Sequence, residues 1–595
     1  MVQPLDLTSL GAAYDTGALK PAQLFDTIFA RIAEIGERPV WISLVQRARI
    51  AERIQEIEKR KEAGEKLHLF GIPFAVKDNI DVAGVPTTAA CPEFAYTPER
   101  SATVVERLEA AGAIVVGKTN LDQFATGLVG TRSPYGIPSS VFDPAYISGG
   151  SSSGSAVSVA SGLVSFSLGT DTAGSGRVPA AFNNIVGLKP TKGLVSTRGV
   201  VPACRTLDCV SIFAGTVDDA LKVLAIAEGF DAEDGYSRSA PSTTASLPVA
   251  FRFGVPAEGL EFFGDRDAAA LYEEAIRNLE ALGGTAVRID FTPFQDAARL
   301  LYEGPWLAER LAALRAYNFE RADAVHPVVW DIVSKAGGTS AVDAFKAFYR
   351  LADLTRAAEA EWDKMDVLLL PTAGTTYRID ELLADPISLN SNLGRYTNFV
   401  NLMDLSAIAV PGGFRADGLP FGVTLMGRAF EDVKIAGLAD RLHRTLENAS
   451  VGGTGLPLPT PSPGASQSNA ISLAVVGAHL SGQPLNWQLI DRKARLVRTA
   501  RTAPGYSFYA LAGTKPAKPG LVYDGKGKGL IEVEIWEVDA SGYGTFVAAI
   551  PPPLGIGTIK LEDGSAVQGF ICEAYAIETA EDITAFGGWR NWLKR

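Results

Sequence analysis

Two neighbouring segments rich in glycine and serine carry residue types that could do chemistry. They read GGSSSGSAVSVASG from Gly149 and GTDTAGSGR from Gly169. Such runs also occur in flexible linkers, but apolar, strand-like sequence surrounds both of these. Glycine permits tight turns and close approach of the backbone to a ligand, and successive backbone N–H groups in such turns form anion-binding concavities. The two segments therefore predict a nucleophilic serine beside an oxyanion pocket.

A hydrolytic serine needs a base, and the familiar histidine is missing from this part of the chain. None occurs between His68 and His326. Lysine is the alternative, because desolvation disfavours its charged form and lowers its pKa. Lys77 directly follows the apolar run GIPFAV, where a half-buried lysine at the end of a strand is expected. Taken alone, such a residue is more often a surface or salt-bridged lysine.

Three motifs in the same order resemble those of the amidase signature family. They read GIPFAVKDNIDVAGVPTT, YISGGSSSGSA and GTDTAGSGRVPAAFNNIVGLKPTKG, and the resemblance spans nearly all of residues 1–450. It implies an α/β fold with a mixed central sheet covered by helices. It also implies that Lys77 is the base, that Ser151, in a cis peptide, relays protons, and that Ser175 is the nucleophile. The family's oxyanion hole carries over to the backbone N–H groups of Thr172, Ala173, Gly174 and Ser175.

This chain departs from the family pattern at two small residues. Ser153 stands where the family commonly has glycine, and the nucleophile turn reads TAGS rather than TGGS. Both replacements are small, so we expect the backbone geometry to survive. Asp171 and Arg177 flank the nucleophile and are acid–base candidates, but a buried ion pair that fixes the turn is the favoured interpretation.

A second set of residues points to the substrate. The segment LLYEGPWLAERLAAL predicts a helix in which Tyr302 and Arg310 lie two turns apart on one side. A buried arginine could bind a carboxylate bidentately, and the tyrosine hydroxyl could add a hydrogen bond. The alternative is a packed tyrosine and a surface arginine.

The same segment, CPEFAYTPERSATVVERL and VVGAHLSGQPLN resemble their counterparts in allophanate hydrolases. The resemblance implies that Tyr302, Arg310 and the backbone near Gly127 hold the carboxylate of allophanate, a small anionic amide. Hydrolysis of its terminal amide would release ammonia and N-carboxycarbamate, which then gives carbon dioxide and a second ammonia. No metal or organic cofactor is expected. A homodimer and a functional link to a urea carboxylase are further expectations.

The C-terminal part resembles the γ-glutamylcyclotransferase-like fold. In some allophanate hydrolases this domain is thought to act on the unstable intermediate, with the histidine of the GAHLSGQPLN motif important, which corresponds to His479. A structural role for His479 is an equal alternative. Rival functions for the whole chain are an amidase acting on another small amide, one chain of a glutaminyl-tRNA amidotransferase, and a non-catalytic binding protein on the same fold.

The elements that must position these residues follow from periodicity. Residues 1 to about 66 read as helical, and residues 266–287 and 340–363 read as amphipathic helices. The runs GIPFAVKDNI, DVLLLPTA, SAIAVPGGF and FGVTLMG read as strands, and DVKIAGLADRLHRTLE reads as a helix. After the linker described next, ISLAVVGAHL, GLIEVEIWEVD, YGTFVAAIPPP and VQGFICEAYAI read as β-rich runs before a short terminal helix.

Composition divides the chain into an amidase domain (1–450), a linker (451–470) and a smaller β-rich domain (471–595). The segment 451–470 is rich in proline, glycine and serine, which is typical of an interdomain linker. The alternative interpretation of this segment is a long surface loop within one domain.

Bulk composition excludes several classes of function. The net charge of -12 and the lack of a basic run argue against nucleic-acid binding. The start of the chain lacks the features of a signal peptide, and no apolar stretch is long enough to span a membrane. Four scattered cysteines form neither a disulfide framework nor a zinc motif. A cytoplasmic location is therefore expected.

Overall fold

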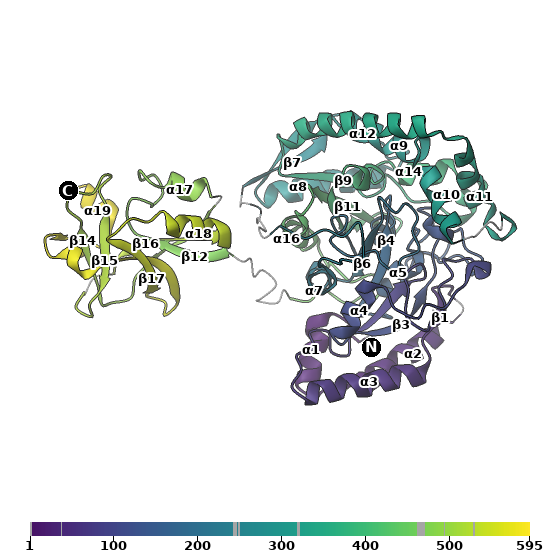
Figure 1. Cartoon of the computed structure of the whole chain (residues 1–595), viewed down its shortest axis with the longest axis horizontal. Coiled ribbons are helices and arrows are strands. Elements are labelled where there is room, and N and C mark those ends of the chain that lie inside the picture. The colour runs from purple at the N-terminus through teal and green to yellow at the C-terminus, as the bar shows by residue number, and fades with distance from the viewer. Residues whose placement is uncertain are drawn as a thin grey trace. The chain divides into compact units, whose positions relative to one another are not determined.

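The computed structural model describes residues 3–36, 38–241, 247, 250–317, 322–460, 470–492, 494–527 and 530–595. The chain divides into two compact units, residues 1–240 with 249–465 and residues 466–595 with 241–248. Figure 1 shows the elements of both units in the colours of the chain order. The first unit has one sheet and the second has two, and each unit has its own core.

Three helices form the N-terminal region of the first unit: α1 (Leu7–Asp15), α2 (Pro21–Ile35) and α3 (Arg47–Glu62). Each buries one apolar stripe, as the predicted periodicity requires. The strand β1 (Trp41–Leu44) interrupts them and pairs with β3 (Ile114–Thr119) at the edge of the sheet. The prediction of helix throughout residues 1–66 is wrong at this strand, because four residues are too short for a periodic signal.

A mixed sheet of 11 strands forms the centre of the first unit. Besides β1 and β3, its strands are β2 (Pro73–Lys77), β4 (Phe166–Asp171), β5 (Val186–Lys189), β6 (Cys209–Ala214), β7 (Phe251–Pro256), β8 (Gly284–Ile289), β9 (Val367–Pro371), β10 (Ser406–Phe414) and β11 (Pro420–Gly427). Their order is β1-β3-β2-β4-β6-β5-β10-β11-β9-β7-β8. Strand β2 lies between β3 and β4 and runs parallel to both. Every residue of β2 and β4 is buried, so side chains at their ends start from a desolvated position.

Helices cover this sheet (Figure 1), which confirms the predicted α/β fold class. They are α4 (Thr103–Ala110), α5 (Ser153–Ala160), α6 (Val178–Phe182), α7 (Val217–Ala227), α8 (Arg266–Ala281), α9 (Thr292–Glu303), α10 (Trp306–Ala316), α11 (Pro327–Ser334), α12 (Ala341–Trp362), α13 (Ile379–Ala384), α14 (Ser388–Leu393), α15 (Phe399–Leu402) and α16 (Asp432–His443). The predicted helix 340–363 is confirmed as α12, which begins at a capping box between Ser340 and Asp343. The predicted helix 266–287 is too long, because Gly283 with φ +97° ends α8 and the chain continues as β8.

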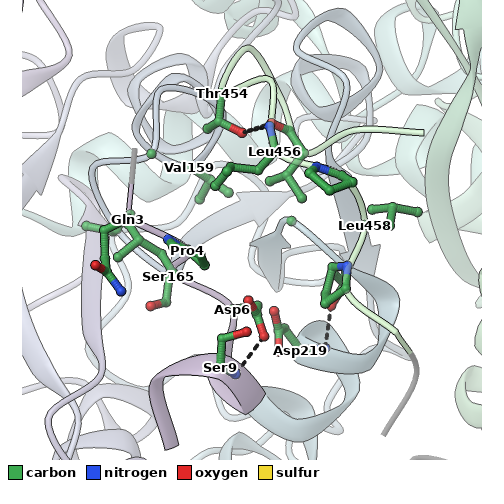
Figure 2. Close-up of a pocket in the computed structure, with 18 of the residues that line it drawn as sticks. Gln3, Pro4, Asp6, Ser9, Val159, Ser165, Asp219, Thr454, Leu456 and Leu458 are labelled. Atoms are coloured by element: carbon green, nitrogen blue, oxygen red, sulfur yellow. Dashed lines mark hydrogen bonds between the residues drawn. The ribbon is translucent and has the colours of Figure 1, made fainter. Parts of the chain in front are cut away.

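The start of the predicted linker packs on the first unit. The N–H groups of Gly452 and Gly453 donate to the carbonyls of Asn184 and Ala160. Figure 2 shows the segment that follows, where it closes a pocket of about 340 Å³ in which Leu456 lies opposite Asp6 and Asp219. None of the predicted site residues lines this pocket. The described part of the linker, up to residue 460, therefore belongs to the first unit, and residues 461–469 lie outside the described residues.

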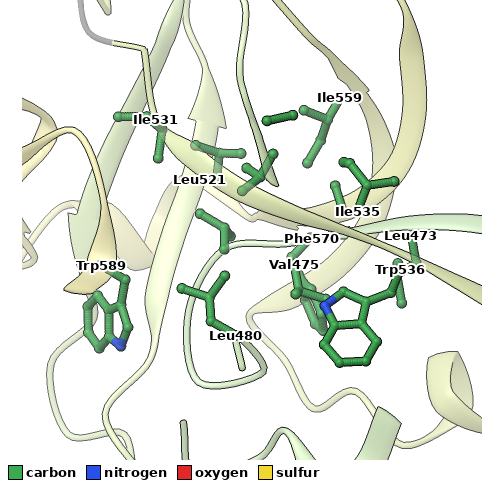
Figure 3. Close-up of a cluster of buried hydrophobic side chains, with 14 of the residues drawn as sticks. Leu473, Val475, Leu480, Leu521, Ile531, Ile535, Trp536, Ile559, Phe570 and Trp589 are labelled. Carbon is green, nitrogen blue, oxygen red and sulfur yellow. The ribbon is translucent and has the colours of Figure 1, made fainter. Parts of the chain in front are cut away.

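The second unit contains a five-stranded sheet and a three-stranded sheet, with orders β13-β16-β12-β18-β17 and β15-β14-β19. The elements are β12 (Ala470–Val475), α17 (Trp487–Ile490), β13 (Arg495–Arg501), β14 (Tyr506–Ala510), β15 (Pro519–Tyr523), β16 (Glu532–Asp539), α18 (Ala540–Ala548), β17 (Leu554–Lys560), β18 (Ala566–Cys572), β19 (Glu581–Asp582) and α19 (Trp589–Leu593). Figure 3 shows their shared core, in which Val475, Ile535 and Phe570 gather with Leu521 and Trp589. The likeness to the γ-glutamylcyclotransferase-like fold stays a prediction.

One element of the second unit differs in type from its prediction. The run YGTFVAAIPPP was predicted as β-rich, but its first half lies in the helix α18. The aromatic and β-branched residues that indicated a strand instead serve packing, since Phe546 is buried against the rings of His479 and Phe570. Tertiary contacts here override local propensity.

No helix among the described residues has the length and apolar character needed to cross a bilayer. The four cysteines, Cys91, Cys204, Cys209 and Cys572, are unpaired and buried. Burial raises the pKa of the Cys204 thiol, so this thiol stays protonated at neutral pH and does not compete as a nucleophile.

Candidate active site

Lys77 lies at the end of β2 with no exposed surface. Its Nζ donates to Ser151 Oγ at 2.8 Å and to Thr170 Oγ1 at 2.7 Å. Both acceptors are neutral hydroxyls, and no carboxylate of the described residues lies within ion-pair distance of this nitrogen. The structure thus places Lys77 beside Ser151 as predicted, and the burial excludes the surface alternative.

The environment of Lys77 favours its neutral form. Burial lowers the pKa of Lys77 to about 7, although the more distant carboxylates of Asp122, Asp208 and Asp171 act in the opposite direction. The Arg310 guanidinium lowers this pKa further. An amine with a pKa near neutrality can accept a proton in the working pH range, which an ordinary lysine does not.

Ser151 sits in a turn that requires glycine. The peptide bond between Gly150 and Ser151 is cis, as the family resemblance implied. A Cβ on Gly150 would lie 2.2 Å from Asp122 Oδ2 and 2.5 Å from the nitrogen of Gly130, so no larger residue fits. The turn leads into α5, and the Ser151 carbonyl accepts the Asp122 N–H. Ser151 is therefore held from both sides of its peptide.

Ser175 belongs to a second turn, residues 171–177, which we call the nucleophile turn. Asp171 at the end of β4 holds this turn, since its carboxylate accepts the N–H groups of Gly174 at 2.8 Å and Gly176 at 3.0 Å. Arg177 donates to the same carboxylate from Nε at 2.8 Å and from Nη2 at 2.9 Å, and both side chains are fully buried. The pair is thus structural, as the favoured interpretation stated.

The oxyanion donors can now be sorted. The Gly174 N–H donates to Asp171, so it is engaged within the turn, and the oxyanion hole itself stays a prediction. The N–H groups of Thr172, Ala173 and Ser175 donate to no residue that the structure describes. A Cβ on Gly174, whose φ is +136°, would lie 2.4 Å from Thr397 Oγ1, so this position needs glycine for the turn itself.

The predicted carboxylate clamp, Tyr302 and Arg310, does not lie on one helix. Tyr302 is in the last turn of α9 and Arg310 is in α10, with Gly304 and Pro305 between them. The single-helix prediction fails because proline lacks an N–H and disfavours helix in the residue before it. Tyr302 lies close enough to Arg310 to act electrostatically on its guanidinium, and their joint role as a carboxylate clamp stays a prediction.

Arg310 is buried at 4% exposure and is connected to the nucleophile through a short chain of contacts. Its Nη1 donates to Thr126 Oγ1 at 3.1 Å. Gly127 is the next residue, and its carbonyl accepts the Ser175 hydroxyl at 3.5 Å. These contacts bring Arg310, Gly127 and Ser175 close together, as the resemblance implied.

Tyr302 also borders a polar cavity. This cavity of about 350 Å³ is lined by Tyr302 together with Arg299, Asn392, Arg395 and Asn398. Asn398 Oδ1 and Arg395 Nε are buried without a hydrogen-bond partner among the described residues. The half-buried side chain of Tyr302 thus lines this cavity and also acts electrostatically on Arg310.

His479 lies in the second unit. Its ring stacks on Phe570 with centroids 5.0 Å apart, and its Nε2 lies 3.0 Å from Gln488 Oε1. Burial lowers its pKa, so the ring is neutral near pH 7. It lines a cavity of about 200 Å³ together with Lys515 and Lys518, which places a neutral imidazole beside two cationic side chains.

Sequence reasoning missed three residues that hold the site: Thr170, Asp122 and Asp208. Thr170 stands inside the quoted motif directly before Asp171, so its position was a usable signal. Asp122 accepts N–H groups across the loop that carries Gly127, and Asp208 binds the Thr172 hydroxyl. Asp208 lies 36 residues from Thr172, so no local pattern indicated it. Asp122 lies seven to ten residues before its partners, and it was not singled out.

Two known families match this chain. The family described as Amidase matches residues 26–435, and the chain belongs to this family. The allophanate hydrolase C-terminal domain matches residues 471–594, so the second unit is the domain that follows the amidase domain in allophanate hydrolases.

Individual relatives share both parts. Urea amidolyase of Lachancea kluyveri is 44% identical over 574 residues, covering 94% of this chain, and the chain spans only 31% of that relative's length. Urea amidolyase of Saccharomyces cerevisiae is likewise 44% identical, covering 93% of this chain and 31% of that protein. The solved structure of Kluyveromyces lactis allophanate hydrolase is 41% identical with a TM-score of 0.84, and the match covers 100% of both chains.

Proposed function

We propose that this chain hydrolyses the terminal amide of allophanate with Ser175 as nucleophile, Ser151 as proton relay and Lys77 as base. The observation that carries the proposal is the buried Arg310 guanidinium, held at Thr126 beside Gly127 and Ser175. A buried cation next to a nucleophile suits an amide substrate that carries a carboxylate. The similarity to Kluyveromyces lactis allophanate hydrolase along the whole chain supports the same substrate.

The mechanism uses the contacts described above. Neutral Lys77 accepts a proton from Ser151, which accepts one from Ser175 as Ser175 Oγ attacks the amide carbonyl. The free N–H groups of the nucleophile turn stabilise the oxyanion, a contribution of roughly 3–4 kcal/mol per strong donor in such sites. The relay then runs backwards and protonates the departing ammonia. Water hydrolyses the acyl-enzyme and releases N-carboxycarbamate.

A second activity is proposed for the C-terminal domain. N-carboxycarbamate carries two carboxylates, and the His479 cavity presents Lys515 and Lys518 beside a neutral imidazole. This set of residues suits binding of a small dianion and transfer of a proton to it as carbon dioxide leaves. The loss of carbon dioxide yields carbamate, which decomposes to the second ammonia and a second carbon dioxide.

Further proposals concern the surroundings of the enzyme. Urea amidolyases match this chain over only part of their length, which supports a functional link to a urea carboxylase that supplies allophanate. A homodimer and a cytoplasmic location stay predictions.

Substitution of Arg310 tests the substrate. Arg310→Leu should raise KM for allophanate roughly thirty- to thousand-fold, because a desolvated carboxylate loses a charge-assisted partner worth about 2–4 kcal/mol. Neutral amides that the wild-type chain hydrolyses should lose much less. The measurement is initial ammonia release from both kinds of substrate, with Arg356→Leu as the control, because Arg356 is exposed on α12 and pairs with Glu359. An equal loss on charged and neutral amides would make Arg310 structural and remove the argument for allophanate.

Truncation tests whether the first unit alone catalyses the first ammonia release. A chain ending after residue 460 should keep the first ammonia release, because the triad and the clamp lie in the first unit and residues 451–460 pack on it.

His479→Ala in the full chain should likewise keep the first ammonia release, and it should slow the conversion of N-carboxycarbamate to carbon dioxide and ammonia. Ammonia and carbon dioxide are followed in parallel, with oligomer size recorded. A folded fragment that lacks the first release would show that the second domain completes the active site.

A further inference from the structure

A short loop makes hydrogen bonds both to the nucleophile turn and to α10, the helix that carries Arg310. We call residues 203–208 the positioning loop. At its end, Asp208 Oδ1 accepts the Thr172 hydroxyl at 2.5 Å and the Cys204 N–H at 3.2 Å. Asp208 Oδ2 accepts the Ala203 N–H at 2.9 Å. One carboxylate, 7% exposed, thus closes the loop on itself and fixes it to the turn that supplies the oxyanion donors.

The middle of the positioning loop is fixed to α10. Glu309 receives the Thr206 N–H on one carboxylate oxygen at 2.7 Å and the Thr206 hydroxyl on the other at 2.8 Å. Glu309 directly precedes Arg310, and the Cys204 thiol lies 3.4 Å from the carbonyl of Trp306 at the start of the same helix. The loop therefore contacts the clamp helix on two successive turns.

A third connection joins the loop to the nucleophile strand. The amide nitrogen of Asn401, which is fully buried, donates to the carbonyl of Asp171 at 2.7 Å and to that of Leu207 at 2.8 Å. The oxyanion donors and Arg310 lie on segments that are far apart in the sequence. The hydrogen bonds of the positioning loop fix the distance and orientation between these two segments.

We propose that Asp208 and Glu309 are positioning residues of the reaction, with Asp208 acting through Thr172 on the oxyanion donors and Glu309 acting through α10 on Arg310. The proposal rests on the proposed function for the roles of these two groups. Oxyanion contacts strengthen in the transition state, so their misplacement lowers kcat. Clamp contacts exist already with bound substrate, so their misplacement raises KM.

The first test separates kcat from KM. Asp208→Asn keeps the shape of the side chain, but its amide cannot accept hydrogen bonds at both ends. It should lower kcat about 10- to 100-fold with KM within about threefold, since small misplacements of reacting groups have effects of this size. Glu309→Gln should raise KM for allophanate about three- to tenfold and leave KM for a neutral amide unchanged. Asp219→Asn, a buried carboxylate on α7 outside the site, is the matched control and should change neither constant.

The second readout is the pH profile of kcat. The groups that act on the Lys77 amine are the carboxylates of Asp122, Asp171 and Asp208 and the guanidinium of Arg310. Burial raises the pKa of Asp208 to about 6, so near pH 7 its carboxylate is charged and favours the protonated amine. Asp208→Asn removes this charge, so the upper part of the acid limb of kcat should move to lower pH. Glu309→Gln should leave the limb in place. A residue that only stabilised the fold would change the melting temperature and leave the limb where it is.

Thr172 supplies a variant pair that does not depend on a soluble Asp208→Asn. Thr172→Val removes the hydroxyl that Asp208 accepts and should lower kcat as Asp208→Asn does, whereas Thr172→Ser should restore it. Unchanged kcat in a folded Asp208→Asn or Thr172→Val variant would overturn the role of Asp208. An effect of Glu309→Gln on neutral amides equal to that on allophanate would overturn the role of Glu309. If the wild-type chain hydrolyses another amide and not allophanate, the proposed function is wrong. The role of Asp208 is then tested by the kcat of Asp208→Asn and Thr172→Val on that other amide.

Discussion

Replacing Ser175 by alanine should leave a folded chain that releases no measurable ammonia from allophanate. The change removes one oxygen from a turn that Asp171 and Arg177 hold independently, so the fold should persist. Without the nucleophile no acyl-enzyme forms, and losses of about 10⁴-fold or more are usual for such residues. The measurement is initial ammonia release at saturating substrate, with circular dichroism and melting temperature as checks of folding.

Ser158→Ala is the matched control for this result. Ser158 is likewise buried, in α5, and among the described residues its hydroxyl donates to the Ser155 carbonyl alone. This variant should keep kcat within about threefold, in line with the loss of one ordinary hydrogen bond. Substantial turnover by a well-folded Ser175→Ala chain would remove Ser175 from the mechanism.

Replacing Lys77 should have the second-largest effect. Lys77→Met keeps much of the side-chain volume and removes the base, and we expect kcat to fall by about 10³- to 10⁴-fold. Lys77→Arg should not restore activity, because a guanidinium stays protonated at any working pH. The two variants together separate the need for a positive charge, which arginine retains, from the need for a group that can lose its proton.

The wild-type pH profile should report the same lysine. Protonated Lys77 cannot accept a proton from Ser151, so kcat should fall as the pH drops below about 7 and level off above it, in line with the pKa of Lys77 at about 7. Lys192→Met is the control, because burial also lowers the pKa of Lys192 but this residue is outside the site. An acid limb that stayed flat between pH 5 and 8, a range of about three units, would contradict a titrating lysine base.

The relation between sequence and structure differs from one part of the site to another. The turns around Ser151 and Ser175 were predictable, because glycine is required locally by backbone conformation and by close approach at Gly150 and Gly174. The ion pair of Asp171 and Arg177 was predictable for the same reason, since its members lie within one turn. Each of these features depends on residues near one another in the chain.

Other features depended on packing between distant segments. The sequence placed Lys77 at the end of a strand, but its low pKa results from the flanking strands β3 and β4 and from α5, which together exclude water. Tyr302 and Arg310 were assigned to one helix, and the break at Gly304 and Pro305 was visible in the sequence but its outcome in space was not. The run that became α18 carried a strand-like composition, and its Phe546 packs against His479 and Phe570, contacts that no local pattern indicates.

The three catalytic candidates came from the resemblance of the motifs to those of the amidase signature family. The sequence by itself determined the order of motifs, the two glycine-dependent turns and the presence of a second β-rich domain. These follow from side-chain types and from conformations that only certain residues adopt. The tertiary structure decided which groups meet: that Lys77 faces Ser151 and Thr170, that Gly174 has no free N–H, and that Asp208 and Glu309 connect the nucleophile turn to α10. The physical reason is that burial and hydrogen bonding between residues far apart in the chain depend on the whole packed core, which no local pattern encodes.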